Sequence, residues 1–264
     1  MPKNIKRFYY NDLNLFLSLV VDPRKNINQG KDTLVEEIMD LVNSSWGNYE
    51  REKIENVFLN LDQIILGRID RELCFITGGK WENISYQINK IPVFRIGLTV
   101  VRKFNKKGEY LWKKGIMSRG TSALLKNIIL KKLFTYFYIA FRTIEPVTYQ
   151  SIIGNLEYVL PDYRNYIHPN DKEKSIAFQI SEIISHGCKF DVEKFVTRDA
   201  FRANLKLAQD KFNEIEQFTN KEIRDFFKTN LDYGRGDAFI ILARASFFYF
   251  LKSWFKNFLI KIFN

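Results

Sequence analysis

The hydrophobic pattern changes its period near residue 62, and this change restricts the fold more than any other feature. Upstream, apolar residues recur at three- and four-residue spacing over residues 32–42 and 50–61. Downstream, the β-prone runs 63–69 and 73–77 flank Asp70 and Arg71 and end at two glycines. The first spacing is typical of amphipathic helices, and runs of the second kind are typical of strands. The sequence therefore predicts two helices followed by an antiparallel hairpin.

The elements that follow predict the fold class. We expect a central strand over residues 93–104, a helix capped by Ser118 over 118–133, an aromatic strand over 134–141 and a helix over 147–153. Strands interleaved with helices are characteristic of a sheet that helices cover. The sequence therefore predicts an α/β fold, more closely an α+β mixed sheet flanked by helices.

Beyond residue 154 the pattern becomes helical for long stretches. Residues 175–185 predict a helix, residues 190–196 a strand, and residues 201–228 one long amphipathic helix. Residues 239–264 predict a final aromatic helix that carries lysines on one broad face. We therefore expect one domain over residues 1–200 and a helical C-terminal extension over residues 201–264.

The final segment, residues 239–264, is open to two interpretations. On a helix, Lys252, Lys256 and Lys261 fall on one face, and Trp254 and Phe258 fall on the other. An interfacial membrane helix needs this combination. A helix that packs on the core or on a partner, with its lysine heads reaching water, has the same pattern. Both peripheral membrane contact and partner binding, including an oligomer, therefore stay open.

The positive charge of the chain is concentrated. The formal net charge is +11, and residues 102–132 contain ten basic residues against the single acid Glu109. Such clustering raises the local concentration of a polyanion, whether a cofactor phosphate, a lipid surface or nucleic acid. The alternative is a solvated lysine-rich face.

Other features limit the class of protein. The two cysteines, Cys74 and Cys188, lie far apart without a CxxC partner, so neither a disulfide framework nor a metal site is predicted. The N-terminal residues lack a secretion signal, and no apolar run is long enough to span a bilayer. We expect a cytoplasmic protein with, at most, peripheral membrane contact.

Two short motifs resemble those of a known family. Residues 118–125, Ser-Arg-Gly-Thr-Ser-Ala-Leu-Leu, form a small-residue stretch that leads into a predicted helix, and residues 141–149 form a strand-to-helix junction, Phe-Arg-Thr-Ile-Glu-Pro-Val-Thr-Tyr. With the hairpin over 63–77, they make residues 30–160 similar to the GNAT acyltransferase superfamily. The match is imperfect: Ser122 and Leu124 stand where the family has small loop residues, and Glu145 stands where it usually has Asn.

This resemblance implies an acyltransferase on a GNAT-like twisted sheet. The donor would be acetyl-CoA or a longer acyl-CoA, and the acceptor an amine whose identity the sequence leaves open. The family's cofactor contacts would fall on Leu98, Thr99, Val100, Val101, Arg119, Gly120, Thr121 and Ser122. Tyr149 is the candidate acid, and Glu145 lies near the same junction. His168 and His186 are considered as bases because histidine is the usual general base near neutral pH, but the sequence identifies no convincing general base.

Two alternatives remain. The first is a non-catalytic basic module that binds nucleic acid through residues 102–132, with Tyr110 and Trp112 as stacking groups. No standard nucleic-acid-binding motif supports it. The second is a degenerate GNAT-like fold that keeps a pocket but serves as an interaction module at a membrane.

Overall fold

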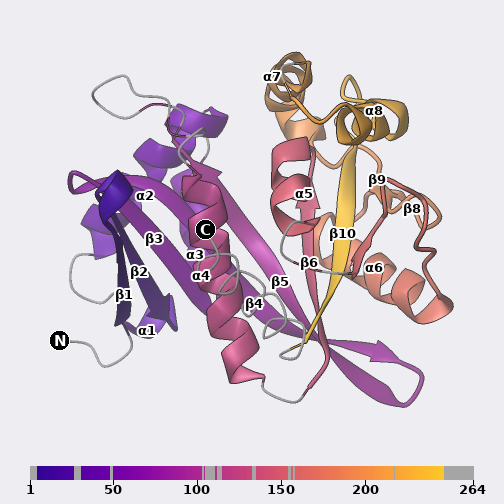
Figure 1. Ribbon diagram of the computed structural model, residues 1–264, viewed down its shortest axis with the longest axis horizontal. Coiled ribbons are helices and arrows are strands. Elements are labelled where there is room, and N and C mark those ends of the chain that lie inside the picture. The colour runs from indigo at the N-terminus through magenta and orange to yellow at the C-terminus, as the bar shows by residue number, and fades with distance from the viewer. Residues whose placement is uncertain are drawn as a thin grey trace, which may run out of the picture. The chain divides into compact units, whose positions relative to one another are not determined.

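The computed structural model describes residues 5–26, 31–47, 50–102, 104, 111, 115–132, 135–153, 156, 158–216 and 218–246. The chain divides into two compact units (Figure 1). Unit 1 combines Met1–Trp81 with Ile96–Ile128, and unit 2 combines Glu82–Arg95 with Ile129–Asn264. Two strands, β4 (Glu72–Tyr86) and β5 (Asn89–Val101), therefore contribute residues to both units.

The structure is a mixed α/β fold whose sheet is flanked by helices. The other strands are β1 (Ile5–Tyr10), β2 (Leu15–Val21), β3 (Gln63–Ile69), β6 (Phe137–Thr143), β7 (Tyr158–Leu160), β8 (Phe190–Asp191), β9 (Val196–Thr197) and β10 (Ala238–Ala245). The helices are α1 (Pro23–Asn26), α2 (Lys31–Trp46), α3 (Arg51–Leu59), α4 (Ile116–Lys131), α5 (Pro146–Ile153), α6 (Asp171–Ile184), α7 (Leu205–Ile215) and α8 (Lys221–Asn230).

The strands follow the order β1-β2-β3-β4-β5-β6-β10-β9-β8, and β7 also pairs with β10. The predicted hairpin is confirmed, because β3 and β4 pair in antiparallel register around Asp70 and Arg71. Both of these turn residues have positive φ, at 50° and 68°. β5 and β6 pair in parallel over three residues of each strand, from Val93 opposite Tyr138 to Arg95 opposite Ala140.

In unit 1, helices α2 and α3 pack on one face of the sheet. Their apolar stripes, which include Val35, Ile38 and Phe58, meet Ile64 of β3 and Ile76 of β4 in one buried cluster. This packing explains why residues 32–42 and 50–61 have helical spacing: one face of each helix must be apolar to cover the strands.

Helix α4 covers the opposite face of unit 1. Gly120 lies directly over Phe75 of β4, and a Cβ at that position would come within 1.9 Å of the Phe75 ring. A second contact is polar: the Asn127 side-chain amide donates to Gln63 Oε1 at 2.6 Å in a buried setting. The approach of α4 to the strands thus depends on the missing side chain at Gly120.

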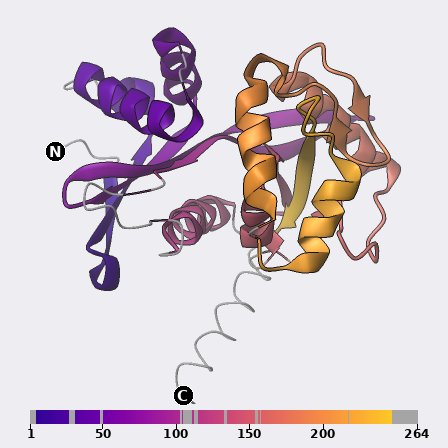
Figure 2. The ribbon, with the colours of Figure 1, turned by 90° about the horizontal axis from the view of Figure 1, so that it is seen from above.

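Unit 2 is built around β6 and β10, an antiparallel pair that runs from Thr143 opposite Phe239 to Phe137 opposite Ala245. Helix α6 packs on one face, where Ile176 and Ile180 meet Ile240 of β10. An aromatic layer covers the other face. There Phe226 of α8 stacks on Phe239 of β10 with ring centroids 4.9 Å apart, and α8 also contacts α5. Figure 2 shows α7 and α8 in orange beside the yellow strand β10.

Two expected helices take a different form. Residues 201–228 do not form one helix but a short 3₁₀ turn followed by α7 and α8, because Asn220 caps a new helix by accepting from the Ile223 amide. Residues 239–245 form the greater part of β10 rather than the start of a helix. The remainder of the predicted aromatic helix, residues 247–264, lies outside the described residues.

The structure also divides the chain differently from the expected boundary at residue 200. Helices α7 and α8 and strand β10 belong to the same compact unit as β6, α5 and α6. No helix in the described part of the chain has both the length and the apolar character that crossing a membrane requires.

Candidate functional site

The expected donor-binding residues all lie in unit 1, at the end of β5 and the beginning of α4. Helix α4 begins at Ile116, two residues before the predicted cap Ser118. Gly115 precedes it with a φ of +68°, which favours glycine, and the first hydrogen bond of the helix runs from the Arg119 amide to the Gly115 carbonyl at 3.1 Å. From Arg119 onward the helix's own carbonyls accept the amides, so an anion at this N-terminus would meet the turn before Arg119.

This geometry changes the role expected of residues 119–122. The amides of Gly120, Thr121 and Ser122 lie inside α4, where the helix's own carbonyls accept them. Gly120 allows close packing on Phe75, and Thr121 is buried. If the stretch binds phosphate, the contact comes from the preceding turn of the helix and from the Arg119 side chain, and not from the loop amides that the sequence suggested.

The Arg119 side chain is held near the N-terminal strands. Its Nη2 donates to Asp12 Oδ2 at 2.6 Å, and its guanidinium carbon lies 5.3 Å from the centre of the Tyr10 ring. Its other terminal nitrogen, Nη1, is buried and has no hydrogen-bond partner among the described residues.

The backbone of β5 offers an edge for pairing. The Arg102 amide donates to the Cys74 carbonyl of β4, so the main chain of Arg102 faces β4. Main-chain groups alternate in direction along a strand, so those of Leu98 and Val100 also face β4. Those of Thr99 and Val101 face away from it. The Val101 carbonyl already accepts from Ser45 Oγ at 3.1 Å. Thr99 is therefore the expected donor-binding residue whose main chain best fits pairing with an extended ligand.

Glu145 lies in unit 2, between β6 and α5, in a cluster of charged groups. Its Oε1 is 2.9 Å from Lys211 Nζ, and its Oε2 accepts from Thr148 Oγ1 at 3.1 Å. Lys211 is largely buried and also pairs with Glu214 at 3.2 Å. Burial lowers the pKa of Lys211, but the two carboxylates raise it by more, so the pKa lies above its ordinary value. The ammonium is therefore firmly charged at neutral pH.

Tyr149 also lies in unit 2, on α5, and its side chain is fully buried. Its hydroxyl donates to the Pro161 carbonyl at 2.7 Å and accepts from the Tyr163 amide at 3.2 Å. Burial raises the pKa of this phenol. A catalytic acid must reach its substrate, whereas this hydroxyl is enclosed and already bonded to two main-chain groups. The geometry therefore favours an anchoring role over the acid role that the sequence suggested.

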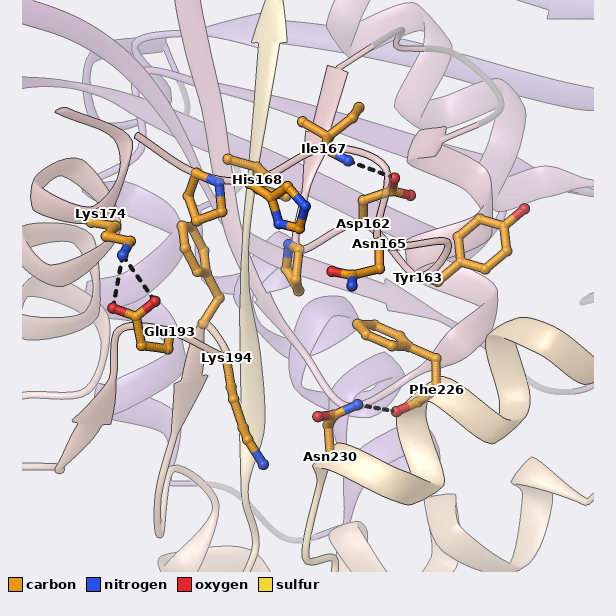
Figure 3. A pocket seen from close by; sticks show the side chains of 14 residues that line it. Asp162, Tyr163, Asn165, Ile167, His168, Lys174, Glu193, Lys194, Phe226 and Asn230 are labelled. Carbon is orange, nitrogen blue, oxygen red and sulfur yellow. Dashed lines mark hydrogen bonds and ion pairs between the residues drawn. The ribbon is translucent and has the colours of Figure 1, made fainter. Parts of the chain in front are cut away.

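The segment that Tyr149 anchors forms one wall of a pocket of about 430 Å³ in unit 2 (Figure 3). Another wall carries Lys194 beside the ion pair of Lys174 with Glu193, and Asn230 comes from α8. His168 lines this pocket, and among the described residues its imidazole forms no hydrogen bond or ion pair. His186 is exposed and does not line it.

Sequence reasoning missed Lys211, Asp12 and Ser45. Lys211 belongs to a segment read as an ordinary amphipathic helix, and nothing in its spacing connects it with Glu145. Asp12 lies on a short 3₁₀ turn between β1 and β2, two strands that the sequence did not predict. Only tertiary contacts bring these residues to the expected site residues.

The basic cluster over 102–132 is only partly described. Arg102 is neutralised by Asp40 at 2.5 Å and Glu72 at 3.5 Å, whereas Lys126 is exposed. Tyr110 and Trp112, the proposed stacking groups, lie outside the described residues, as do five of the lysines. Among the described residues, no three His, Cys, Asp or Glu side chains are grouped to hold a metal ion.

The fold is similar to those of several solved enzymes. An aminoglycoside 6′-acetyltransferase type Ii is 17% identical, with 54% of this chain and 86% of that chain covered and a TM-score of 0.36. The GCN5-related N-acetyltransferase from Kribbella flavida is 12% identical, with 69% and 47% covered and a TM-score of 0.40. The N-myristoyltransferase of Saccharomyces cerevisiae, solved with myristoyl-CoA, is 14% identical, with 74% and 53% covered and a TM-score of 0.34.

No protein-family profile and no curated protein sequence matches the chain. At these identities and TM-scores, the structural likeness by itself carries no conclusion about activity. The function must be argued from the chain's own residues.

Proposed function

We propose that this protein is an N-acyltransferase that uses an acyl-CoA-type thioester. The observation that carries the proposal is the strand-to-helix arrangement in unit 1. β5 has a main-chain edge at Thr99, and α4 follows with its N-terminus and with Arg119, whose buried Nη1 has no hydrogen-bond partner in the described part of the chain. The motif resemblance to GNAT acyltransferases over residues 30–160 is consistent with it.

The two ends of such a donor need different partners. A pantetheine arm carries amides that can pair with a strand edge, as the main chain of Thr99 allows. A pyrophosphate carries negative charge, which helix N-terminal amides and an arginine stabilise. The N-terminus of α4 and Arg119 provide both of these groups in unit 1.

The reaction requires few side chains. The acceptor's amine nitrogen attacks the thioester carbonyl, a C–N bond forms, the C–S bond breaks, and CoA leaves as the thiol after gaining the proton that the amine loses. Positioning and charge stabilisation dominate such a transfer. We propose Glu145 as the acceptor-side carboxylate that attracts the amine, since Lys211 and Thr148 hold it in a fixed position.

Donor binding is tested with a matched pair of arginine variants. The side chains of Arg119 and Arg68 are 30% and 29% exposed. Arg119 pairs with Asp12, and Arg68 pairs with Glu37. We expect acetyl-CoA or a long-chain acyl-CoA to bind the wild type saturably in isothermal titration. Arg119→Met should weaken binding about tenfold or more, because a charged hydrogen bond is worth ~1.5–3 kcal/mol.

Arg68→Met should bind the donor as the wild type does, because it removes a similar ion pair elsewhere in unit 1. The proposal is overturned if neither thioester binds the wild type, or if the two variants weaken binding equally. Comparing the two thioesters also gives the acyl length to pursue.

Acceptor-side chemistry is tested by thiol release from the donor in the presence of a panel of primary amines. Glu145→Gln and Glu214→Gln both remove a carboxylate that pairs with Lys211. We expect only Glu145→Gln to lower kcat/KM, by about 10² or more if the carboxylate contacts the reacting amine. An equal effect of the two variants would mean that Glu145 acts only through Lys211.

A further inference from the structure

A second hollow in unit 2 differs in chemistry from the pocket of Figure 3. Its volume is about 610 Å³, within the range typical of small-molecule sites. It is lined by the β4–β5 turn region, by Tyr136 and Tyr138, by the start of α6 and by Arg244 of β10. Three lining residues are cationic, and no carboxylate lines it among the described residues.

Arg244 is held in place by a buried carboxylate. Glu173 is fully buried and accepts from Arg244 Nη2 at 2.9 Å. It also accepts from the hydroxyls of Tyr158 at 2.7 Å and Tyr138 at 3.3 Å, and from the main-chain amide of Asn170 at 3.1 Å. The guanidinium also lies over the Tyr158 ring, 4.3 Å from its centre. The Arg244 side chain nevertheless remains 40% exposed, so a rigid guanidinium faces the hollow.

Two lysines add charge that nothing in the described chain neutralises. Lys90 is the second residue of β5 and Lys172 lies in the first turn of α6, and neither forms an ion pair among the described residues. Lys172 Nζ is held 5.7 Å from the centre of the Tyr138 ring. Together with Arg244, they give the hollow a positive field that would repel a cationic ligand and attract an anionic one.

Aromatic rings form the apolar part of the lining. Tyr136 is 69% exposed and Tyr86 is half-buried, and both belong to the lining. Exposed rings beside cations are the combination that binds a planar base together with a phosphate. A fixed guanidinium favours phosphate in particular, because it offers several donors in one plane.

We propose that this hollow binds a nucleoside phosphate. Arg244, Lys172 and Lys90 would hold the phosphate, and the base would lie against Tyr136 and Tyr86. The site is separate from the donor-binding residues of the proposed function, which all belong to unit 1.

The test is isothermal titration of the full chain with AMP, ATP and a 5′-phosphorylated single-stranded oligonucleotide of about eight nucleotides. Each titration is made on the wild type and on Arg119→Met, so that nucleotide bound at the proposed donor site, which depends on Arg119, is distinguished from nucleotide bound in the hollow. Inorganic pyrophosphate serves as the ligand without a base. We expect saturable binding of at least one nucleotide probe, tighter than that of pyrophosphate. Free nucleotides and the oligonucleotide distinguish the two sources of the ligand.

Two pairs of variants locate the binding. The double variant Lys90→Glu/Lys172→Glu should weaken binding about tenfold or more, whereas Lys189→Glu/Lys221→Glu makes the same charge change at other exposed positions of unit 2 and should not. Tyr136→Ala should weaken binding about tenfold through lost stacking, whereas Tyr166→Ala, at an 80% exposed ring outside the lining, should have no effect. Arg244 is left intact because its loss would leave Glu173 with a buried, uncompensated charge.

The proposal is overturned if no nucleotide binds the wild type, if Arg119→Met abolishes nucleotide binding, if pyrophosphate binds as tightly as the nucleotides, or if the control variants weaken binding as much as the site variants. These results are distinguishable from failure of the acyltransferase proposal, since CoA binding and its sensitivity to Arg119→Met are measured separately.

Discussion

Gly120 determines how closely α4 packs on β4 in unit 1. Its hydrogen takes the space that a Cβ would share with the Phe75 ring, at 1.9 Å from Cε1. We expect Gly120→Ala to lower the free energy of unfolding by ~1–3 kcal/mol, the usual cost of overpacking, even though alanine is the better helix former. Urea unfolding measures the loss.

Lys126→Ala, at an exposed position of the same helix, is the control and should change stability by less than ~0.5 kcal/mol. If steric conflict is the cause, Phe75→Leu should recover part of the loss in the double variant. Absence of any recovery would show that the helix, rather than the contact, is affected.

Asp237 is the residue whose charge depends most clearly on the fold. It is fully buried and accepts from Arg198 Nη1 at 2.8 Å and from Arg235 Nη2 at 2.6 Å. Burial alone would raise the pKa of this carboxyl, but the two guanidinium groups and two main-chain amides lower it by more. We expect Asp237→Asn to lower the free energy of unfolding by ~3 kcal/mol at pH 7, because it leaves the two arginines without their charged partner.

The stability that Asp237 contributes should fall as the pH is lowered. Folding lowers the pKa of Asp237, so this carboxylate stabilises the folded state fully above its unfolded pKa of ~3.9. That stabilisation is lost as the pH falls through the lower pKa of the folded state. The difference between wild type and Asp237→Asn in urea unfolding should therefore shrink between pH 5 and pH 2. Asp225→Asn, which removes the carboxylate of a surface pair with Arg224, is the control and should change the free energy of unfolding by less than ~1 kcal/mol. A constant difference at all pH values would contradict the assignment.

At the scale of elements, α5 is tied to the segment after β7 by one side chain. The Tyr149 hydroxyl bonds the Pro161 carbonyl and the Tyr163 amide, so Tyr149→Phe leaves two main-chain groups without their partner. We expect a loss of ~1–3 kcal/mol in the free energy of unfolding. Tyr163→Phe is the control, because the Tyr163 hydroxyl has no hydrogen bond among the described residues.

The same variant separates anchoring from catalysis. If Tyr149 only anchors, thiol release by Tyr149→Phe should stay within a few fold of the wild type at temperatures where the variant is folded. A fall of about 10² or more in kcat with little loss of stability would instead restore Tyr149 as the catalytic acid.

Amphipathic helices and strands next to turn residues were predictable from the sequence, whereas β10 was not. Helices α2, α3 and α6 show their period in the sequence, since one face of each is buried and the other is exposed. The β3–β4 hairpin is marked instead by two β-prone runs on either side of the turn residues Asp70 and Arg71. β10, by contrast, reads Ala-Phe-Ile-Ile-Leu-Ala-Arg-Ala and is buried along nearly its whole length. Such a run has no alternation and is compatible with a helix or a strand.

At the scale of the molecule, two strands belong to both compact units. β4 passes from unit 1 to unit 2 after Trp81, and β5 returns after Arg95. Because each of these strands continues from one unit into the other, we expect the units to unfold together. Gly120→Ala, a change in unit 1, should lower the urea midpoint for slowly exchanging amides of β6 and β10 as much as for those of β3. Separate midpoints would show that each unit unfolds independently.

For the candidate site, the sequence identified the segments but not the contacts. It pointed to β5, to the beginning of α4 and to the β6–α5 junction, because local motifs mark a strand end and a helix start. It did not show that Gly120 packs on Phe75, that Lys211 pairs with Glu145, or that the Tyr149 hydroxyl is enclosed. These contacts join residues from separate elements.

The sequence by itself determined the mixed α/β class, the central hairpin and most of the helices, because hydrophobic period and turn residues act over a few neighbouring positions. Only the tertiary structure decided that β10 lies beside β6, that Arg244 is fixed by Glu173, and which amides of α4 remain outside its own hydrogen bonds. The physical reason is that burial and long-range pairing are properties of the whole fold, and residues far apart in the chain carry no local mark of the partners they meet.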